Sequence, residues 1–215
     1  MRLPKWISSF SLAGILVVSL CLPAFATPAQ EARATLEASI NQVLQELNKP
    51  GLHQVEEQKA ILQRIESVIR GIFDFEELSA RTVGPGWKKF TPDQKARFVD
   101  EFSDLLRETY LEKLNGYNGE TVVYKGEQTS TAGDKVEVLT SVNIKGKDVP
   151  VSYRIIKKDG WVVYDMVIEG ISMVQNYRSQ FQDLLLKGDV EALIRQVGAK
   201  AQETRAYNKK QQITL

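Results

Sequence analysis

The sequence predicts an α+β fold, with a curved antiparallel sheet of about four strands covered on one face by several helices. Apolar residues recur at helical spacing before residue 116 and after residue 170, whereas residues 121–169 show the period-two alternation of strands. Two tight-turn signals interrupt the alternating region. Its strands are therefore consecutive in the chain and antiparallel.

The alternating region folds back on itself at these two turns. An Asp-Gly pair at residues 159–160 predicts a two-residue hairpin that sets Arg154 opposite Asp165. An earlier pair, Gly146-Lys147, predicts a second two-residue turn that sets Val142 opposite Val151. Because side chains alternate along a strand, both turns place the same side chains on one apolar face, which something must cover. This face comprises Val136, Val138, Thr140, Val142, Ile144, Val149, Val151, Tyr153, Ile155, Val162, Tyr164, Met166 and Ile168.

The helical segments have clear start and stop signals. Thr91-Pro92-Asp93-Gln94 is a capping box with proline at the first helical position. The helix that follows has an apolar stripe wide enough to cover a sheet. The expected helices cover residues 28–48, 55–69, 73–78, 92–115, 171–187 and 190–199, and a polar tail, frayed or helical, follows from about residue 200.

Residues 1–26 are expected to be a secretory signal peptide. The segment starts with a positive charge, continues with an apolar run over residues 7–22, and ends in the small-x-small site Ala24-Phe25-Ala26. Cleavage after Ala26 leaves residues 27–215 as a single domain. A membrane anchor is the alternative, but the apolar run is short for a span.

The single cysteine and the single histidine restrict the chemistry. Cys21 lies in the leader, so the mature chain has no disulfide, and lipoprotein processing at Cys21 is disfavoured by the bulky Leu20 before it. With His53 as the only histidine, a zinc site is not expected. The formal net charge is +1, and the absence of a strongly basic stripe argues against nucleic-acid binding.

Catalytic motifs are missing. A Ser-His-Asp triad has no support, and no phosphate loop, dinucleotide fingerprint or Gly-x-Ser-x-Gly motif occurs. Arg154 and Asp165 are expected to form a structural cross-strand ion pair. The carboxylates of residues 74–77 are expected to complement a helix dipole. An enzyme is therefore the weaker interpretation, and no cofactor is expected.

The apolar faces have two interpretations. They can pack into an ordinary core, which is the usual role of aromatic and methionine side chains. They can also enclose a lipid-sized cavity between the sheet and the helices. Periodicity alone does not separate the two.

Two ordered blocks of motifs stand out along the chain. The first block is Phe73-Asp74-Phe75-Glu76-Glu77-Leu78, Gly84-x-x-Trp87, Phe90-Thr91-Pro92-x-Gln94 and Phe98-x-x-x-Phe102-x-x-Leu105-Leu106-x-x-x-Tyr110. The second is Trp161-x-Val163-Tyr164-Asp165-x-x-Ile168-Glu169-Gly170-Ile171-Ser172 followed by Asn176-Tyr177-Arg178-x-x-Phe181. Together they resemble the MlaC family, periplasmic phospholipid-binding proteins also known as toluene-tolerance auxiliary proteins, and the resemblance extends over about residues 31–198.

The resemblance implies a soluble periplasmic carrier with a fold similar to the nuclear transport factor two type. Such a carrier shuttles phospholipid between an inner-membrane ABC transporter complex, with its MCE-domain protein, and an outer-membrane lipoprotein–porin complex. It thereby maintains the lipid asymmetry of the outer membrane. The alternatives are a periplasmic chaperone or scaffold, and a small-molecule enzyme on a cone-shaped fold.

On this interpretation, acyl chains pack between the apolar sheet face and one helix, and three further residues line or gate the mouth. The sheet residues are Val138, Thr140, Val142, Val151, Tyr153, Ile155, Tyr164, Met166 and Ile168. The helix residues are Phe98, Phe102, Leu105, Leu106 and Tyr110, and the mouth residues are Phe73, Leu78 and Trp87. No metal ligand or catalytic residue is predicted.

Overall fold

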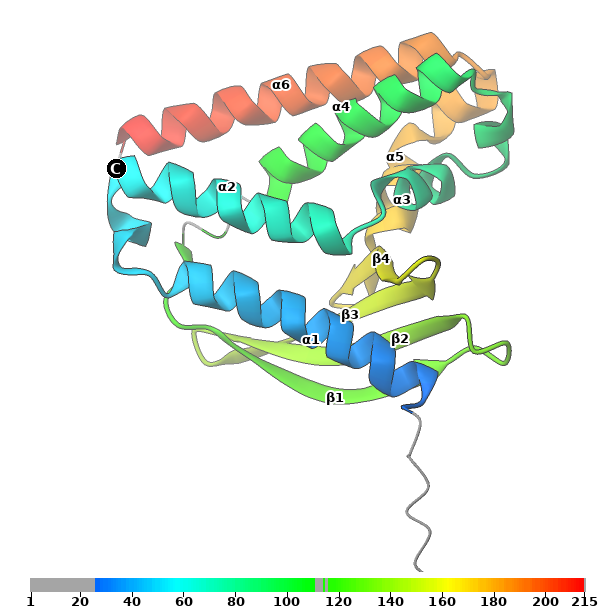
Figure 1. Cartoon of the computed structure of the whole chain (residues 1–215). Coiled ribbons are helices and arrows are strands. Elements are labelled where there is room, and N and C mark those ends of the chain that lie inside the picture. The colour runs from blue at the N-terminus through cyan, green and yellow to red at the C-terminus, as the bar shows by residue number, and fades with distance from the viewer. Residues whose placement is uncertain (1–25, 111–113, 115, 215) are drawn as a thin grey trace, which may run out of the picture.

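The computed structural model describes residues 26–110, 114 and 116–214, in which a five-stranded antiparallel sheet lies beneath a set of helices (Figure 1). The helices are α1 (Pro28–Leu47), α2 (Val55–Ile72), α3 (Phe75–Val83), α4 (Pro92–Tyr110), α5 (Met173–Lys187) and α6 (Val190–Thr214), with 3-10 turns at Pro50–His53 and Gly84–Lys89. The strands are β1 (Thr121–Thr129), β2 (Lys135–Ile144), β3 (Lys147–Lys157), β4 (Trp161–Ile168) and β5 (Ile171–Ser172). The α+β prediction is confirmed, with the strands paired in chain order. Residues 1–25 of the expected leader lie outside the described residues.

The β2–β3 hairpin has the predicted apolar face but a different pairing. Its two-residue turn is Lys145-Gly146, with φ of 51° and 82°, rather than the predicted pair one residue later. Val142 consequently pairs with Val149, not with Val151. Positive φ at both central residues is typical of a type I′ turn, whose backbone twist matches the twist of the two strands that it connects. A pairing shift of two residues preserves alternation, so the face is unchanged.

The β3–β4 hairpin corrects the predicted face near its turn. Lys157 pairs with Trp161, so the loop has one residue more than predicted, and a bulge leaves Tyr164 as an extra residue. Trp161 and Val163 therefore take the buried face, where Val162 and Tyr164 were expected. Beyond the bulge the register returns to the prediction, and the pairing of Arg154 with Asp165 is confirmed.

The helix that covers the sheet is α1, not α4. Ala32 and Leu36 of α1 pack with residues of the sheet's apolar face, namely Val136, Val138, Ile155, Trp161 and Val163. The stripe of α4 instead packs against α5 and α6, where Phe98 and Phe102 contact Phe181 at ring-centroid distances of 6.4 and 5.9 Å. The capping box of α4 is present, because Gln94 accepts from the Thr91 N–H and donates its own N–H to the Thr91 hydroxyl.

The polar C-terminal segment is the second half of α6, a continuous helix beside α4 (Figure 1). Ala201 is buried against the helical cluster. Arg205 forms ion pairs with Asp104 and Glu108 of α4 at 2.9 and 2.8 Å. The burial of Ala201 and the ion pairs of Arg205 hold residues 200–214 against α4, although the composition of this segment indicated only a polar tail.

Asp165 joins the sheet to the helical cluster. Its buried carboxylate accepts hydrogen bonds from Arg154 Nη1 at 3.0 Å, from the Ser172 hydroxyl at 2.7 Å and from the Val174 N–H at 3.1 Å. Ser172 is also the N-cap of α5, whose hydroxyl accepts from the Gln175 N–H. One carboxylate thus sets the position at which α5 leaves the sheet.

Replacement of Asp165 should therefore destabilise the fold. Asp165→Ala leaves three donors without their shared acceptor in a buried site, and we expect the free energy of unfolding to fall by about 3 kcal/mol. Urea unfolding measures this change. The matched control is Asp148→Ala, which removes an exposed carboxylate from the neighbouring strand and should change stability little. Equal losses in the two variants would refute the proposed role of Asp165.

Candidate functional site

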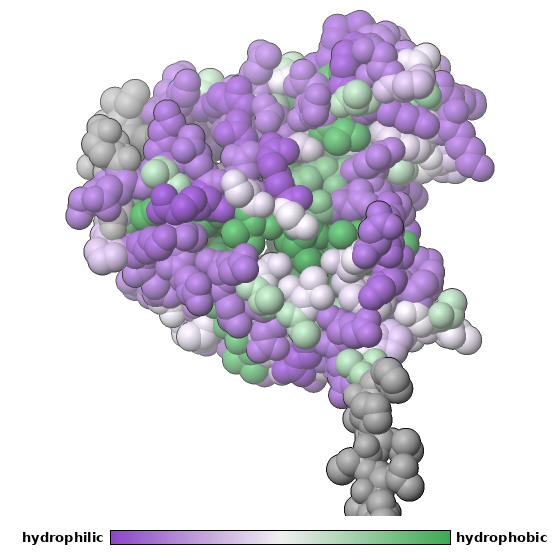
Figure 2. All heavy atoms as spheres, in the orientation of Figure 1, coloured by the Kyte–Doolittle hydropathy of each residue, from purple (hydrophilic) through white to green (hydrophobic). Residues whose placement is uncertain are grey.

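A cavity of about 590 Å³ lies between α1 with the sheet on one side and α2, α3 and α4 on the other. This size falls within the range of about 300–1,000 Å³ that is usual for ligand pockets. Figure 2 shows apolar atoms gathered in the middle of this face of the molecule, between the polar helices above and the sheet below. The apolar lining residues are Leu36, Ile40, Val43, Leu44, Leu47, Val68, Ile69, Ile72, Phe73, Phe75, Leu78, Leu106, Leu114, Val122, Val142, Ile144, Met166 and Met173.

The lining residues show that this part of the interior is not filled. Ile40, Val43 and Leu44 of α1 remain partly accessible although they belong to the helix face that packs inward. Val122 and Val142, a cross-strand pair of β1 and β2, are partly accessible too. Apolar side chains in a close-packed core would be fully buried. Their remaining surface faces the cavity, which therefore suits an apolar ligand.

Tyr153 is the polar group of the cavity wall formed by the sheet. It lies on β3 beside the apolar cluster under α1, and it also lines the cavity. Burial raises the pKa of its phenol to about 12, and the neighbouring Tyr124 adds a smaller effect in the same direction. Tyr153 is partly buried in the sheet, and the surface that it retains lines the cavity.

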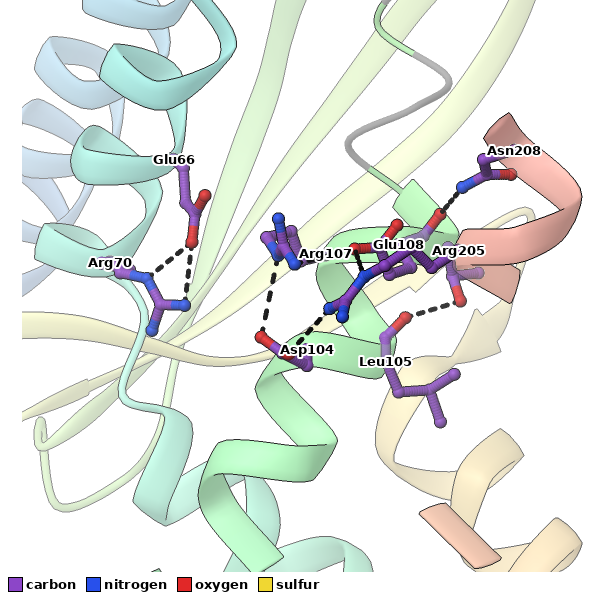
Figure 3. A network of polar contacts seen from close by, with 9 residues as sticks. Glu66, Arg70, Asp104, Leu105, Arg107, Glu108, Arg205 and Asn208 are labelled. Atoms are coloured by element: carbon purple, nitrogen blue, oxygen red, sulfur yellow. Dashed lines mark hydrogen bonds and ion pairs between the residues drawn. The ribbon is translucent and has the colours of Figure 1, made fainter. Parts of the chain in front are cut away.

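Charged lining residues gather in two places. Glu66 and Arg70 of α2 face Arg107 of α4, while Glu120 and Lys145 lie near the start of β1 and in the β2–β3 turn. Figure 3 shows the first group, where dashed lines join Glu66 to Arg70 and connect Arg107 to acidic residues of α4. The charges mark the parts of the lining that meet solvent, because unpaired charges in an apolar interior are costly.

The structure places the seventeen predicted binding residues in three environments. Those that line the cavity are Phe73, Leu78, Leu106, Tyr110, Val142, Tyr153 and Met166. Those in or against the helical cluster are Trp87, Phe98, Phe102 and Leu105, and those in the sheet away from the lining are Val138, Thr140, Val151, Ile155, Tyr164 and Ile168. The Thr140 hydroxyl donates a hydrogen bond to the Val151 carbonyl at 2.8 Å. The guanidinium carbon of Arg81 lies over the Tyr164 ring, 4.0 Å from the ring centroid.

The binding residues predicted from the sequence do not include the walls formed by α1 and α2. The stripe of Leu36, Ile40, Val43, Leu44 and Leu47 lies in the helix predicted over residues 28–48, but the prediction places the helix of residues 92–115 over the sheet. The signal was present, since this stripe continues over more than three turns, but a stripe does not say which surface it faces.

Two further observations concern the described residues only. None of their helices combines the length and apolar character required to cross a membrane. No group of three or more histidine, cysteine, aspartate or glutamate side chains among them is arranged to hold a metal ion.

The enclosed position of Tyr153 has a measurable consequence. A tyrosine whose pKa is raised on folding stabilises the protein below its unfolded pKa of 10.0, and this contribution is lost as the pH rises towards 12. We expect Tyr153→Phe to remove one tyrosine that ionises near pH 12 from the ultraviolet titration, and to weaken the fall in stability over this interval. A lost step near pH 10 would instead place Tyr153 in contact with bulk water.

Comparison with known proteins supplies the relationship. A family model described as the MlaC protein matches residues 37–199. The intermembrane phospholipid transport system binding protein MlaC of Haemophilus influenzae is 21% identical over 140 residues, which is 63% of this chain and 65% of that protein, slightly under two thirds of its length. The toluene tolerance protein ttg2D of Pseudomonas putida is 22% identical over 177 residues, 80% of this chain and 81% of that protein.

A solved structure extends the relationship to the fold. A phospholipid-binding protein from Ralstonia solanacearum, determined in complex with a phospholipid, superposes with a TM-score of 0.74 and is 30% identical. The alignment covers 81% of this chain and 99% of that one. Motif order, the family model and the structural match agree, and this chain belongs to the MlaC family.

Proposed function

We propose that this protein is a soluble phospholipid carrier that holds acyl chains in the cavity between α1, α2, α4 and the sheet. The observation that carries the proposal is the unfilled apolar interior of about 590 Å³. A relative with a similar fold has been solved with a phospholipid bound, which supports the same class of ligand here. In this proposal the acyl chains contact the cavity-lining subset of the predicted residues together with the inward faces of α1 and α2.

The energetics suit a carrier rather than a permanent binder. Burial of acyl chains is favourable by about 0.8 kcal/mol per CH₂, so two chains of about fifteen methylenes gain about 24 kcal/mol relative to water. The bilayer that the lipid leaves offers a similar gain. The cavity therefore has to bury the acyl chains about as favourably as the membrane does and to leave the head group near solvent. An apolar interior with charges only at its rim meets both requirements.

We further propose that the protein works in the periplasm after cleavage behind Ala26, as one domain that starts at Thr27. Thr27 is the N-cap of α1 and forms a capping box with Gln30, so the mature chain would begin at the first residue the fold uses. The proposed exchange partners are an inner-membrane ABC transporter complex with its MCE-domain protein and an outer-membrane lipoprotein–porin complex. The relatives' names, which include intermembrane phospholipid transport, support this placement.

Two neighbouring valines of β1 provide a matched test. Val122 lines the cavity, whereas the next side chain, Val123, is 47% exposed on the other face of the strand. We expect the purified wild-type protein to show phospholipid adducts in native mass spectrometry, verified by organic extraction. Val122→Trp should fill part of the cavity and lose most of this lipid, while Val123→Trp should keep it.

Folding of both variants is checked by urea unfolding. Equal lipid content in the wild type and in a folded Val122→Trp would place the ligand elsewhere. A clean apo mass for the wild type, persisting after incubation with liposomes, would refute the carrier function and favour a scaffold, a chaperone or an enzyme.

A further inference from the structure

The rim of the cavity between α2 and α4 contains two arginines whose charges are held in place. Arg70 and Arg107 both line the cavity, and Arg70 also lines a small polar pocket with Asp100, Glu101, Ser103 and Asp104 of α4. In Figure 3 the two guanidinium groups extend from their helices into the space between α2 and α4. They lie where the apolar interior meets the polar surface.

Arg70 is positioned by its own helix and by an aromatic ring. Its Nε and Nη2 atoms contact Glu66 Oε1 at 2.9 and 2.8 Å. Its guanidinium lies 5.8 Å from the ring centroid of Phe75, which itself lines the cavity. A guanidinium has five N–H donors, so these contacts orient the group and leave donors for a ligand.

Arg107 is positioned from the opposite side. Its Nη2 atom lies 2.7 Å from Glu108 Oε1, and its Nε atom lies 3.7 Å from Asp104 Oδ1. Both carboxylates also bind Arg205 of α6, at 2.8 and 2.9 Å. They would therefore keep a partner if Arg107 were replaced.

The arginines of this rim carry no excess positive charge, because carboxylates accompany them. Arg70 is matched by Glu66, while Arg107 and Arg205 are matched by Asp104 and Glu108. Asp100 and Glu101 also line the small pocket beside Arg70. The rim therefore presents oriented donors without a positive net field. It suits an anionic group that is held by hydrogen bonds rather than attracted by excess positive charge.

We propose that Arg70 and Arg107 bind the phosphate of the phospholipid at the α2–α4 rim, an inference that rests on the proposed carrier function. In a diacyl phospholipid the phosphate is joined through glycerol to the acyl chains, so chains that fill the cavity place the phosphate at its rim. Planar guanidinium groups match phosphate oxygens in a way that an ammonium group does not. Because the two arginines contact only the phosphate in this assignment, the rim accepts any alcohol on the phosphate and discriminates against lipids that lack it.

A competition between two lipids tests the proposal. Delipidated protein is mixed with detergent-solubilised phosphatidylethanolamine and with diacylglycerol carrying the same acyl chains, and native mass spectrometry measures the occupancy of each. We expect the wild type to favour the phospholipid, and each of Arg70→Gln and Arg107→Gln to reduce that preference about tenfold. Arg107→Lys should restore it only in part.

The same helices supply matched controls. Arg64→Gln on α2 and Arg97→Gln on α4 also remove ion-paired arginines, bonded to Glu46 and to Asp93 and Glu191, but neither residue lines the cavity. Both should leave the lipid preference unchanged. An equal effect in a control and a rim variant would overturn the assignment.

The remaining outcomes separate the assignment from the function beneath it. If the wild type binds both lipids equally, the phosphate assignment fails while the carrier function stands. If it binds neither, the carrier function fails first.

Discussion

The fold depends on keeping two apolar layers apart. One layer is α1 on the sheet, with its own core around Val138, Ile155 and Val163. The other is the layer of helices α2 to α6, most of which form a core around Phe98 and Phe102. Because each layer has its own buried core, the space between them can remain unfilled without the loss of either core.

Contacts at the two ends of the cavity hold the layers in place. At one end, Lys158 of the β3–β4 turn binds Asp74, the N-cap of α3, at 2.6 Å and Glu77 of α3 at 2.9 Å, and the Asp74 N–H donates to the Val163 carbonyl. The Asp165 carboxylate acts nearby. At the other end, α1 and α2 converge on a small cluster of Leu47, Leu52, Ile61 and Ile65. The ends are thus fastened, while the lining between them stays free for a ligand.

The sequence predicted local structure well and the assembly of layers less well. Alternation and turn residues placed β2 and β3 on the correct face, since a register error of two residues does not change which face a side chain occupies. No sequence pattern marked the bulge at Tyr164. The bulge adds one residue to β4 and the hairpin turn has one residue more than predicted, so the two deviations cancel and the pairing beyond the bulge is the predicted one. The choice between α1 and α4 as the cover of the sheet was also open, because both helices carry apolar stripes.

The candidate site was harder to predict for a related reason. Core and cavity residues share one composition, so Phe102 and Ile40 look equally apolar in the sequence, although one is fully buried and the other faces the cavity. Only the arrangement of the layers separates them. The motifs that indicated the family mostly lie in α3, α4, β4 and α5, whereas much of the cavity wall comes from α1 and α2.

The most direct test of the central claim locates the acyl chains themselves. Isotope-filtered nuclear Overhauser spectra would be recorded on methyl-labelled protein loaded with unlabelled phospholipid. We expect contacts from acyl methylenes to the methyl groups of Ile40, Val122 and Val142, and none to Val123 on the outer face of β1. Acyl contacts confined to exposed methyl groups, with none to Ile40 or Val142, would contradict a lipid-filled cavity between the two layers.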